Sequence, residues 1–98
     1  MSQKVEETLN RINTHKGVKG VIVVDSGKDS DRKGFAIRST MSQDDTIETG
    51  SLIINFQNKA NDAIKKIFKD EEIVFIRIRS REHEIMIAPD KDFTMIVI

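Results

Sequence analysis

The last quarter of the chain alternates between short hydrophobic and polar runs, and this pattern predicts three consecutive β-strands. Residues 73–79, 84–88 and 93–98 are expected as strands, with turns at residues 80–83 and 89–92. Connections this short join antiparallel neighbours, so the three strands are expected to form a meander.

The first half of the chain contains a second pair of expected strands. Residues 21–24 are a continuous β-branched run between Gly20 and Asp25, which is typical of a strand covered on both faces. Residues 26–34 are all polar or glycine and predict an exposed loop. Residues 35–40 then predict a second strand, antiparallel to the first.

Two segments have the apolar spacing of a helix. Residues 3–15 predict a short amphipathic helix with Val5, Leu9 and Ile12 on its apolar side. Residues 45–68 predict a much longer helix, with Asp44 or Asp45 as its N-cap. One stripe of this long helix is expected to cover the sheet, and it consists of Ile53, Phe56, Ala60, Ala63, Ile64, Ile67 and Phe68.

Three further apolar residues of the long helix, Ile47, Leu52 and Ile54, lie outside that stripe and are expected on its flanks. The predicted order is helix, two strands, long helix, three strands. No repeat or linker interrupts this order, so residues 1–98 are expected to form a single domain, an α/β sandwich of the α+β class.

Composition narrows the possible functions. Sixteen basic residues balance sixteen acidic ones in this chain of 98 residues, so the positive field that nucleic-acid binding requires is missing, and no nucleic-acid partner is expected. The same neutrality argues against binding to an anionic membrane surface, and no apolar run approaches the roughly 20 residues that span a bilayer. The chain has no cysteine, which fits a reducing cytoplasmic environment.

Motifs for catalysis are weak throughout. Gly27-Lys28-Asp29 lacks the upstream glycine and the hydroxyl of a phosphate-binding loop. The acidic residues of the 26–34 loop lack the spacing of a calcium-binding EF-hand. His15 and His83 are isolated in a chain without cysteine, so neither a zinc cage nor a Cys–His pair is expected. We therefore predict a non-enzymatic protein without metal or cofactor.

The strand at 73–79 has two distinct faces. Alternation places Val74, Ile76 and Ile78 on one face, and Ile73, Phe75, Arg77 and Arg79 on the other. As the first strand of a meander it has a neighbour on one side only, and an open apolar edge favours pairing with another chain. The alternative is that the arginines protect the edge from pairing.

A homodimer is the simplest product of such an edge, because a two-fold axis allows the strand to pair with its own copy. Ile47, Leu52 and Ile54 support this interpretation, because they are expected to be exposed apolar groups on a monomer. The expected dimer interface is therefore Ile47, Leu52, Ile54, Ile73, Phe75, Arg77 and Arg79.

Several segments resemble the Roadblock family of dynein light chains. The similar segments are residues 5–9, 16–24, 38–41, 75–80 and 84–93, and the most specific is Ala88-Pro89-Asp90-Lys91-Asp92. The resemblance runs from about residue 5 to the C-terminus and is weakest across the long helix. Two departures, the long charged loop at 26–34 and the asparagine-rich surface of the long helix, indicate a divergent paralogue.

The resemblance implies a five-stranded antiparallel sheet flanked by two helices and extended across a homodimer, or across a heterodimer with a paralogue. It also implies a cytoplasmic, microtubule-associated function as a non-catalytic light chain of a dynein motor complex, adapting the motor to cargo. The dynein intermediate chain would then bind around Val5, Leu9 and Ile12 of the first helix. The alternatives are a scaffold or regulator of small GTPases and, less in keeping with the motifs, a ligand-sensing or enzymatic domain of similar topology.

Overall fold

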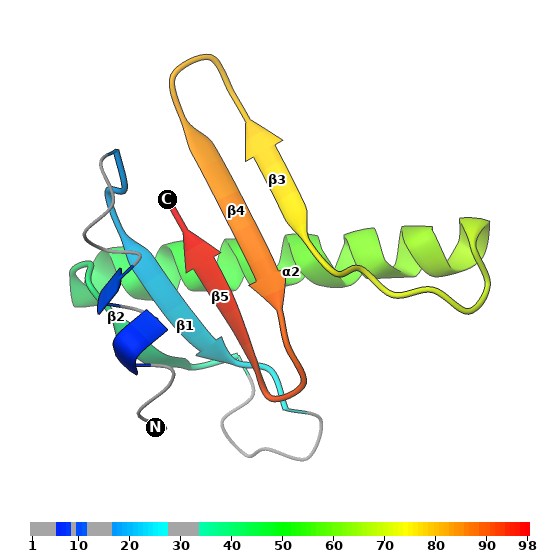
Figure 1. Ribbon diagram of the computed structural model, residues 1–98, viewed down its shortest axis with the longest axis horizontal. Helices are drawn as coiled ribbons and strands as arrows, with labels where there is room; N and C mark the ends of the chain where they lie inside the picture. Colours follow the sequence, from blue (N-terminus) through cyan, green and yellow to red (C-terminus); the bar gives the residue numbers. More distant parts are fainter. Residues whose placement is uncertain (1–5, 9, 12–16, 28–33) are drawn as a thin grey trace.

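The most deeply buried strand is β1, Val21–Asp25, in which the run of β-branched residues has no exposed surface. The structure, a computed structural model, describes residues 6–8, 10–11, 17–27 and 34–98. The further elements are β2 (Ala36–Ser39), α2 (Gln43–Ile67), β3 (Ile76–Arg79), β4 (Glu84–Pro89) and β5 (Phe93–Val97). Residues 6–8 and 10–11 are helical, so the fold is α+β with two helices, as expected (Figure 1).

The five strands form one antiparallel sheet in the order β2-β1-β5-β4-β3. β1 pairs with β2 on one side and with β5 on the other. β5 pairs with β4, and β4 pairs with β3, which confirms the predicted meander. Since β2 and β3 end the order, each has one edge without a neighbouring strand among the residues that the structure describes.

The two faces of the sheet pack separate apolar clusters because side chains alternate along each strand. On one face, Ile22, Val24, Ile87 and Ile96 pack with Ile53 of α2. On the other face, the buried cluster consists of Val21, Val23, Met95 and Val97. β1 contributes to both clusters, so the prediction that this strand is covered on both faces is confirmed.

Ser42, rather than Asp44 or Asp45, is the N-cap of α2. Its side-chain oxygen accepts a hydrogen bond from the Asp45 backbone N–H at 3.2 Å. Next to it, the Ser39 and Thr46 hydroxyl oxygens lie 2.6 Å apart and join the end of β2 to the first turn of the helix. The start of α2 is therefore fixed by the chain leaving β2, and the aspartates occupy the first turn instead.

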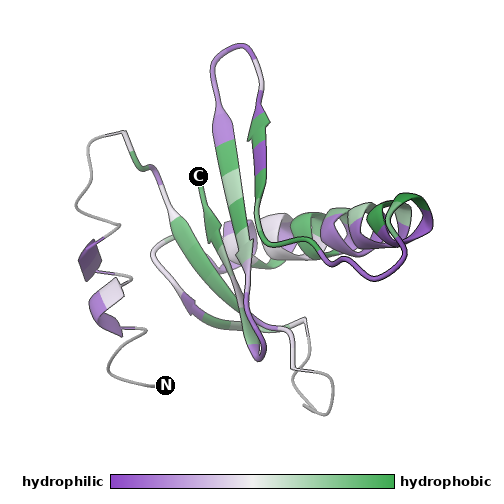
Figure 2. Cartoon of the chain, turned by 45° about the vertical axis from the view of Figure 1, so that its right-hand side comes forward, coloured by the Kyte–Doolittle hydropathy of each residue, from purple (hydrophilic) through white to green (hydrophobic). Residues whose placement is uncertain are grey.

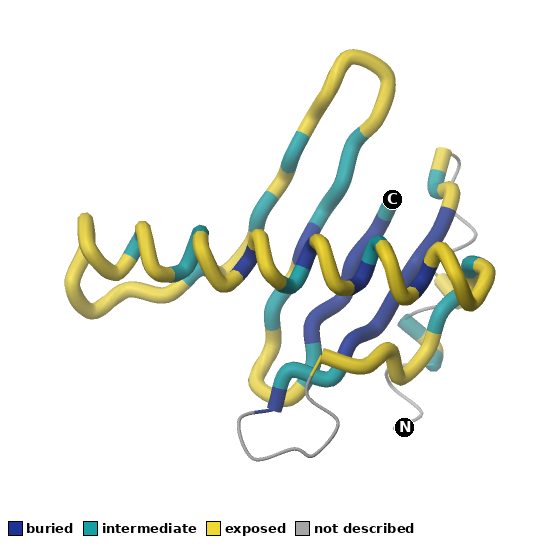
Figure 3. Tube along the Cα trace, turned by 180° about the vertical axis from the view of Figure 1, so that it is seen from behind, coloured by how far each residue is buried: buried dark blue, intermediate teal, exposed yellow. Residues whose placement is uncertain are grey.

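α2 crosses one face of the sheet and continues past it (Figure 3). Its buried residues are Thr46, Gly50, Ile53 and Gln57, all in the first 15 positions of a 25-residue helix. The last ten positions have no buried residue because the sheet beneath them has ended. The predicted sheet-covering stripe is therefore wrong in part: Phe56, Ala63, Ile67 and Phe68 are exposed.

The helical residues near the N-terminus belong to the opposite side of the sheet. Arg38 of β2 pairs with Val23 in the strand register, which puts its side chain on the face away from Ile53. The Arg38 guanidinium forms an ion pair with Glu6, with Nε and Oε1 3.0 Å apart. The two helical regions are therefore on opposite faces of the sheet (Figure 1).

The segment between α2 and β3 is longer than the alternation predicts. The expected strand at 73–79 begins only at Ile76. The Ile73 backbone N–H donates to Asn61 Oδ1 of α2 at 3.1 Å, so this residue is fastened to the helix instead of a strand. Among the described residues no helix is long and apolar enough to cross a membrane.

Candidate interaction surface

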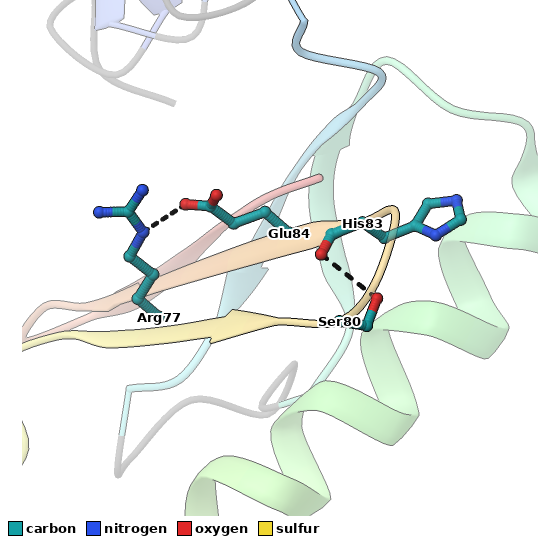
Figure 4. A network of polar contacts seen from close by, with 4 residues as sticks. All are labelled: Arg77, Ser80, His83 and Glu84. Atoms are coloured by element: carbon teal, nitrogen blue, oxygen red, sulfur yellow. Dashed lines mark hydrogen bonds and ion pairs between the residues drawn. The ribbon is translucent and has the colours of Figure 1, made fainter.

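The outer edge of β3 presents unpaired backbone groups at the two arginines. The Ser80 backbone N–H donates to the His83 carbonyl at 2.8 Å and closes the β3–β4 hairpin. The Ser80 hydroxyl donates to the same carbonyl at 3.3 Å (Figure 4). Hydrogen-bonded pairs alternate along an antiparallel ladder. Ile78–Ile85 and Ile76–Ile87 are therefore the bonded pairs, and the N–H and C=O groups of Arg77 and Arg79 point outward.

A second stripe of apolar residues runs along α2, on a side of the helix that does not face the sheet. This outer stripe consists of Leu52, Phe56, Ala60, Ala63 and Ile67, which recur every three or four positions. Leu52, Phe56 and Ile67 are 63%, 44% and 68% exposed. Large apolar side chains in a row on a surface mark an interaction site.

The segment after α2 continues this apolar surface. Phe68, Val74 and Phe75 are all more than half exposed. Figure 2 shows hydrophobic residues both at the end of α2 beyond the sheet and in the segment that leads into β3. Exposed apolar residues therefore come directly before β3 in the sequence, next to its open edge.

The residues predicted for the dimer interface are only partly brought together. Ile47 and Leu52 are both exposed, but five positions separate them by about 140° around the helix. Ile54 was expected to be exposed and is instead half-buried against the core cluster around Ile53. Ile73 is half-buried beside α2, whereas Phe75 adjoins the β3 edge.

Arg77 and Arg79 lie on the face of the sheet away from α2, opposite Met86 and Glu84 of β4 in the register. Arg77 forms an ion pair with Glu84, which reaches diagonally across the two strands (Figure 4). The hydrogen bond from Arg77 is the main reason that the pKa of Glu84 lies below its usual value, and the charge of Arg79 adds to this. The same hydrogen bond raises the pKa of Arg77.

The charges of α2 are unequally distributed along its length. Asp44 and Asp45 lie in the first turn, and Lys65 and Lys66 lie in the last. This arrangement complements the helix dipole, which favours anions at the N-terminus and cations at the C-terminus. It also makes the helix electrostatically complementary to a second copy running in the opposite direction.

The residues predicted to bind the intermediate chain, Val5, Leu9 and Ile12, lie outside the described part of the chain. Their neighbours Glu6 and Thr8 are half-buried, and the Glu6–Arg38 ion pair joins this region to β2. The role of the three residues therefore stays a prediction.

Two recesses in the described part of the surface are further candidates for a ligand site. One, of about 220 Å³, is lined by charged residues of the β3–β4 hairpin and by Lys19. The other, of about 200 Å³, lies between the start of β2 and α2 and is lined by Phe35, Ala36, Ile47 and Gly50. Within the described ranges, no group of three or more acidic or histidine side chains is arranged to hold a metal ion.

Two features of the surface were missed from the sequence. Phe56, Ala60, Ala63 and Ile67 of the outer stripe were assigned to the sheet-covering side because they share a helical spacing with Ile53, whereas Leu52 was placed on a flank. The Arg77–Glu84 pair depends on the register of two strands. The short 80–83 turn, which fixes that register, was the signal for it.

Comparison with known protein families matches residues 4–98 to the Roadblock/LC7 domain. The match covers both faces of the sheet, the open β3 edge and the whole of α2.

Proposed function

This chain belongs to the Roadblock/LC7 family, and on that premise we propose that it is a non-catalytic, dimeric light chain of a dynein motor complex. It binds the dynein intermediate chain and helps to link the motor to its cargo on microtubules. Residues 1–98 act as one domain, and the unit that functions is a pair of such domains.

The observation that carries the proposal is the open β3 edge beside an uncovered helix. Pairing β3 with its copy satisfies the outward backbone groups of Arg77 and Arg79 and extends the sheet across both subunits. The outer stripe of α2 supplies the apolar area, and about 1,600 Å² in total suffices for a stable interface. A paralogue with the same edge can take the place of the second copy.

The charge distribution of α2 supports a two-fold arrangement. Around such an axis the two long helices run in opposite directions, so the first-turn aspartates of one approach the last-turn lysines of the other. Exposed pairs of this kind add little affinity, typically below about 1 kcal/mol each. They favour the antiparallel orientation over the parallel one, which brings like charges together.

Dimerisation provides the mechanism of the adaptor. Two equivalent sites around one axis hold two intermediate chains, so that binding of the second chain becomes nearly intramolecular. The first helix, with Val5, Leu9 and Ile12, is the proposed contact. A disordered intermediate-chain segment would fold as it docks and offset its lost entropy by burying apolar area.

The decisive experiment is a binding titration with two kinds of purified bait, an intermediate-chain peptide and a panel of small GTPases. The proposal predicts a complex with the peptide at about 10 µM or tighter, equivalent to about −7 kcal/mol. A Leu9→Asp variant should lose the peptide, and Glu7→Gln, on the same helix, serves as the matched control. Exclusive binding to a GTPase would replace the dynein assignment by a scaffold or regulator of GTPases.

A further inference from the structure

The outward backbone groups of β3 belong to its two arginines, and this restricts how two copies can pair. In an antiparallel ladder between copies, only residues with outward groups form the bonded pairs. Two registers keep both strands within β3, Ile76–Arg79. One places Arg77 opposite its own copy, and the other places Arg77 opposite Arg79 of the second copy.

Both registers bring arginine side chains together. Arg77 and Arg79 extend from the same face of the sheet, so all four guanidinium groups of a pair gather at the two-fold axis. Residues directly opposite one another have Cβ atoms about 5 Å apart, and like charges at that separation oppose pairing. The open edge of β3 can therefore pair with a second copy, but its arginines repel those of that copy.

Glu84 is placed to relieve that repulsion from within each subunit. It lies on β4, one strand away from the open edge, and on the same face as the arginines. Its carboxylate binds Arg77 Nε, so the guanidinium is held by an opposite charge from within its own subunit (Figure 4). Glu84 thus contributes no contact across the axis but halves the positive charge that each β3 strand brings to it.

We propose that Glu84 is a positioning residue for pairing with a second copy of this chain, because it neutralises and holds Arg77 so that two β3 edges can meet. This inference rests on the proposed function, since it requires dimerisation through β3. The ability of the β3 edge to pair with a second copy then depends on one carboxylate that lies outside the interface.

The test measures the dimer dissociation constant by sedimentation equilibrium, at about 50 mM and 500 mM salt. Glu84→Gln, which keeps the side chain's shape, should weaken the wild-type dimer roughly three- to tenfold at low salt. High salt should remove most of that difference, because it screens the repulsion between arginines. Glu82→Gln, at the tip of the same hairpin, is the control and should pair like the wild type.

A double variant separates charge relief from simple support of the hairpin. Arg77→Gln with Glu84→Gln removes both charges, and it should restore pairing to near the wild-type level. If Glu84→Gln pairs as tightly as the wild type, the inference is wrong. It is equally wrong if the double variant and high salt fail to restore pairing, because the loss would then come from a weakened hairpin.

Failure of the proposed function has a different signature in the same experiment. A wild-type protein that stays monomeric at tens of micromolar would contradict dimerisation itself. A wild-type dimer that is indifferent to the charge at Glu84 would contradict only the positioning role.

Discussion

Individual polar residues decide where the elements of this chain begin and how they are charged. Ser42 caps α2, although two aspartates follow it that have the same capping chemistry. The choice depends on the Ser39–Thr46 hydrogen bond, which places the first turn above the end of β2. The sequence pattern contains all three capping candidates and no information on that contact, so it predicted the helix and misplaced its first residue.

The capping role predicts unequal costs for similar substitutions. Ser42→Ala should lower the free energy of unfolding by about 1 kcal/mol, because it leaves the Asp45 N–H without its acceptor. Asp44→Ala should cost less, since it removes only an interaction with the helix dipole. Urea unfolding followed by circular dichroism measures both, and an equal cost would contradict the assignment of the cap.

The Arg77–Glu84 pair predicts a specific pH dependence. Because the pKa of Glu84 is lowered in the folded protein, the pair stabilises the fold above the usual glutamate value of 4.5. That contribution is lost as the pH falls through the lowered value. Arg77→Gln should raise the titration midpoint of the Glu84 carboxyl carbon, measured by NMR. An unchanged midpoint would show that Arg77 is not the cause.

At the scale of elements, the alternation of apolar and polar residues and the turn lengths were sufficient to predict how the strands pair. They were insufficient to predict where each strand begins and ends. The 80–83 and 89–92 turns predicted the β3–β4–β5 meander correctly because connections so short leave no other pairing. The start of β3 was misplaced by three residues, since Ile73–Phe75 alternate like a strand while the Ile73 N–H is bonded to Asn61. The alternation of apolar and polar residues contains no information about a hydrogen bond to a side chain of a neighbouring helix.

The outward groups of β3 predict a pattern of amide exchange. The N–H groups of Ile76 and Ile78 bond to β4 and should be protected from hydrogen exchange at any protein concentration. Those of Arg77 and Arg79 should exchange quickly in a dilute monomer and become protected in the dimer. Hydrogen exchange followed by NMR at two protein concentrations measures all four amides. Fast exchange of the arginine amides in a proven dimer would exclude β3 pairing.

For the whole molecule, the fold class follows from the order of elements, but the interaction surface depends on how far the sheet extends. Helical periodicity assigned Phe56 and Ile67 to the core because their spacing matches that of Ile53. Ile67 is uncovered because it lies in the part of α2 past the sheet. Phe56 is uncovered because its neighbours Ile53 and Gln57 face the sheet in its place. Ile47 and Leu52 were predicted together for the dimer, and their separation around α2 makes them a test of which flank pairs.

Two aspartate substitutions distinguish the flanks of α2. Leu52→Asp should weaken the dimer by about tenfold or more, because it places a charge in the apolar outer stripe. Ile47→Asp, which is similarly exposed, should have a much smaller effect if only the outer stripe pairs. Size-exclusion chromatography with light scattering measures both, and the reverse order would move the interface to the Ile47 side of the helix.

The projection of α2 past the sheet also has a consequence for how the protein persists in a cell. If the chain pairs as proposed, the uncovered end of this helix gains its tertiary support from another chain, and the stability of the fold rises with the concentration of copies. Single copies would expose backbone that a protease can reach, whereas paired copies would not. The amount of protein in the cell would then depend on pairing. Chains made in excess of their partners would be degraded, and paired chains would accumulate.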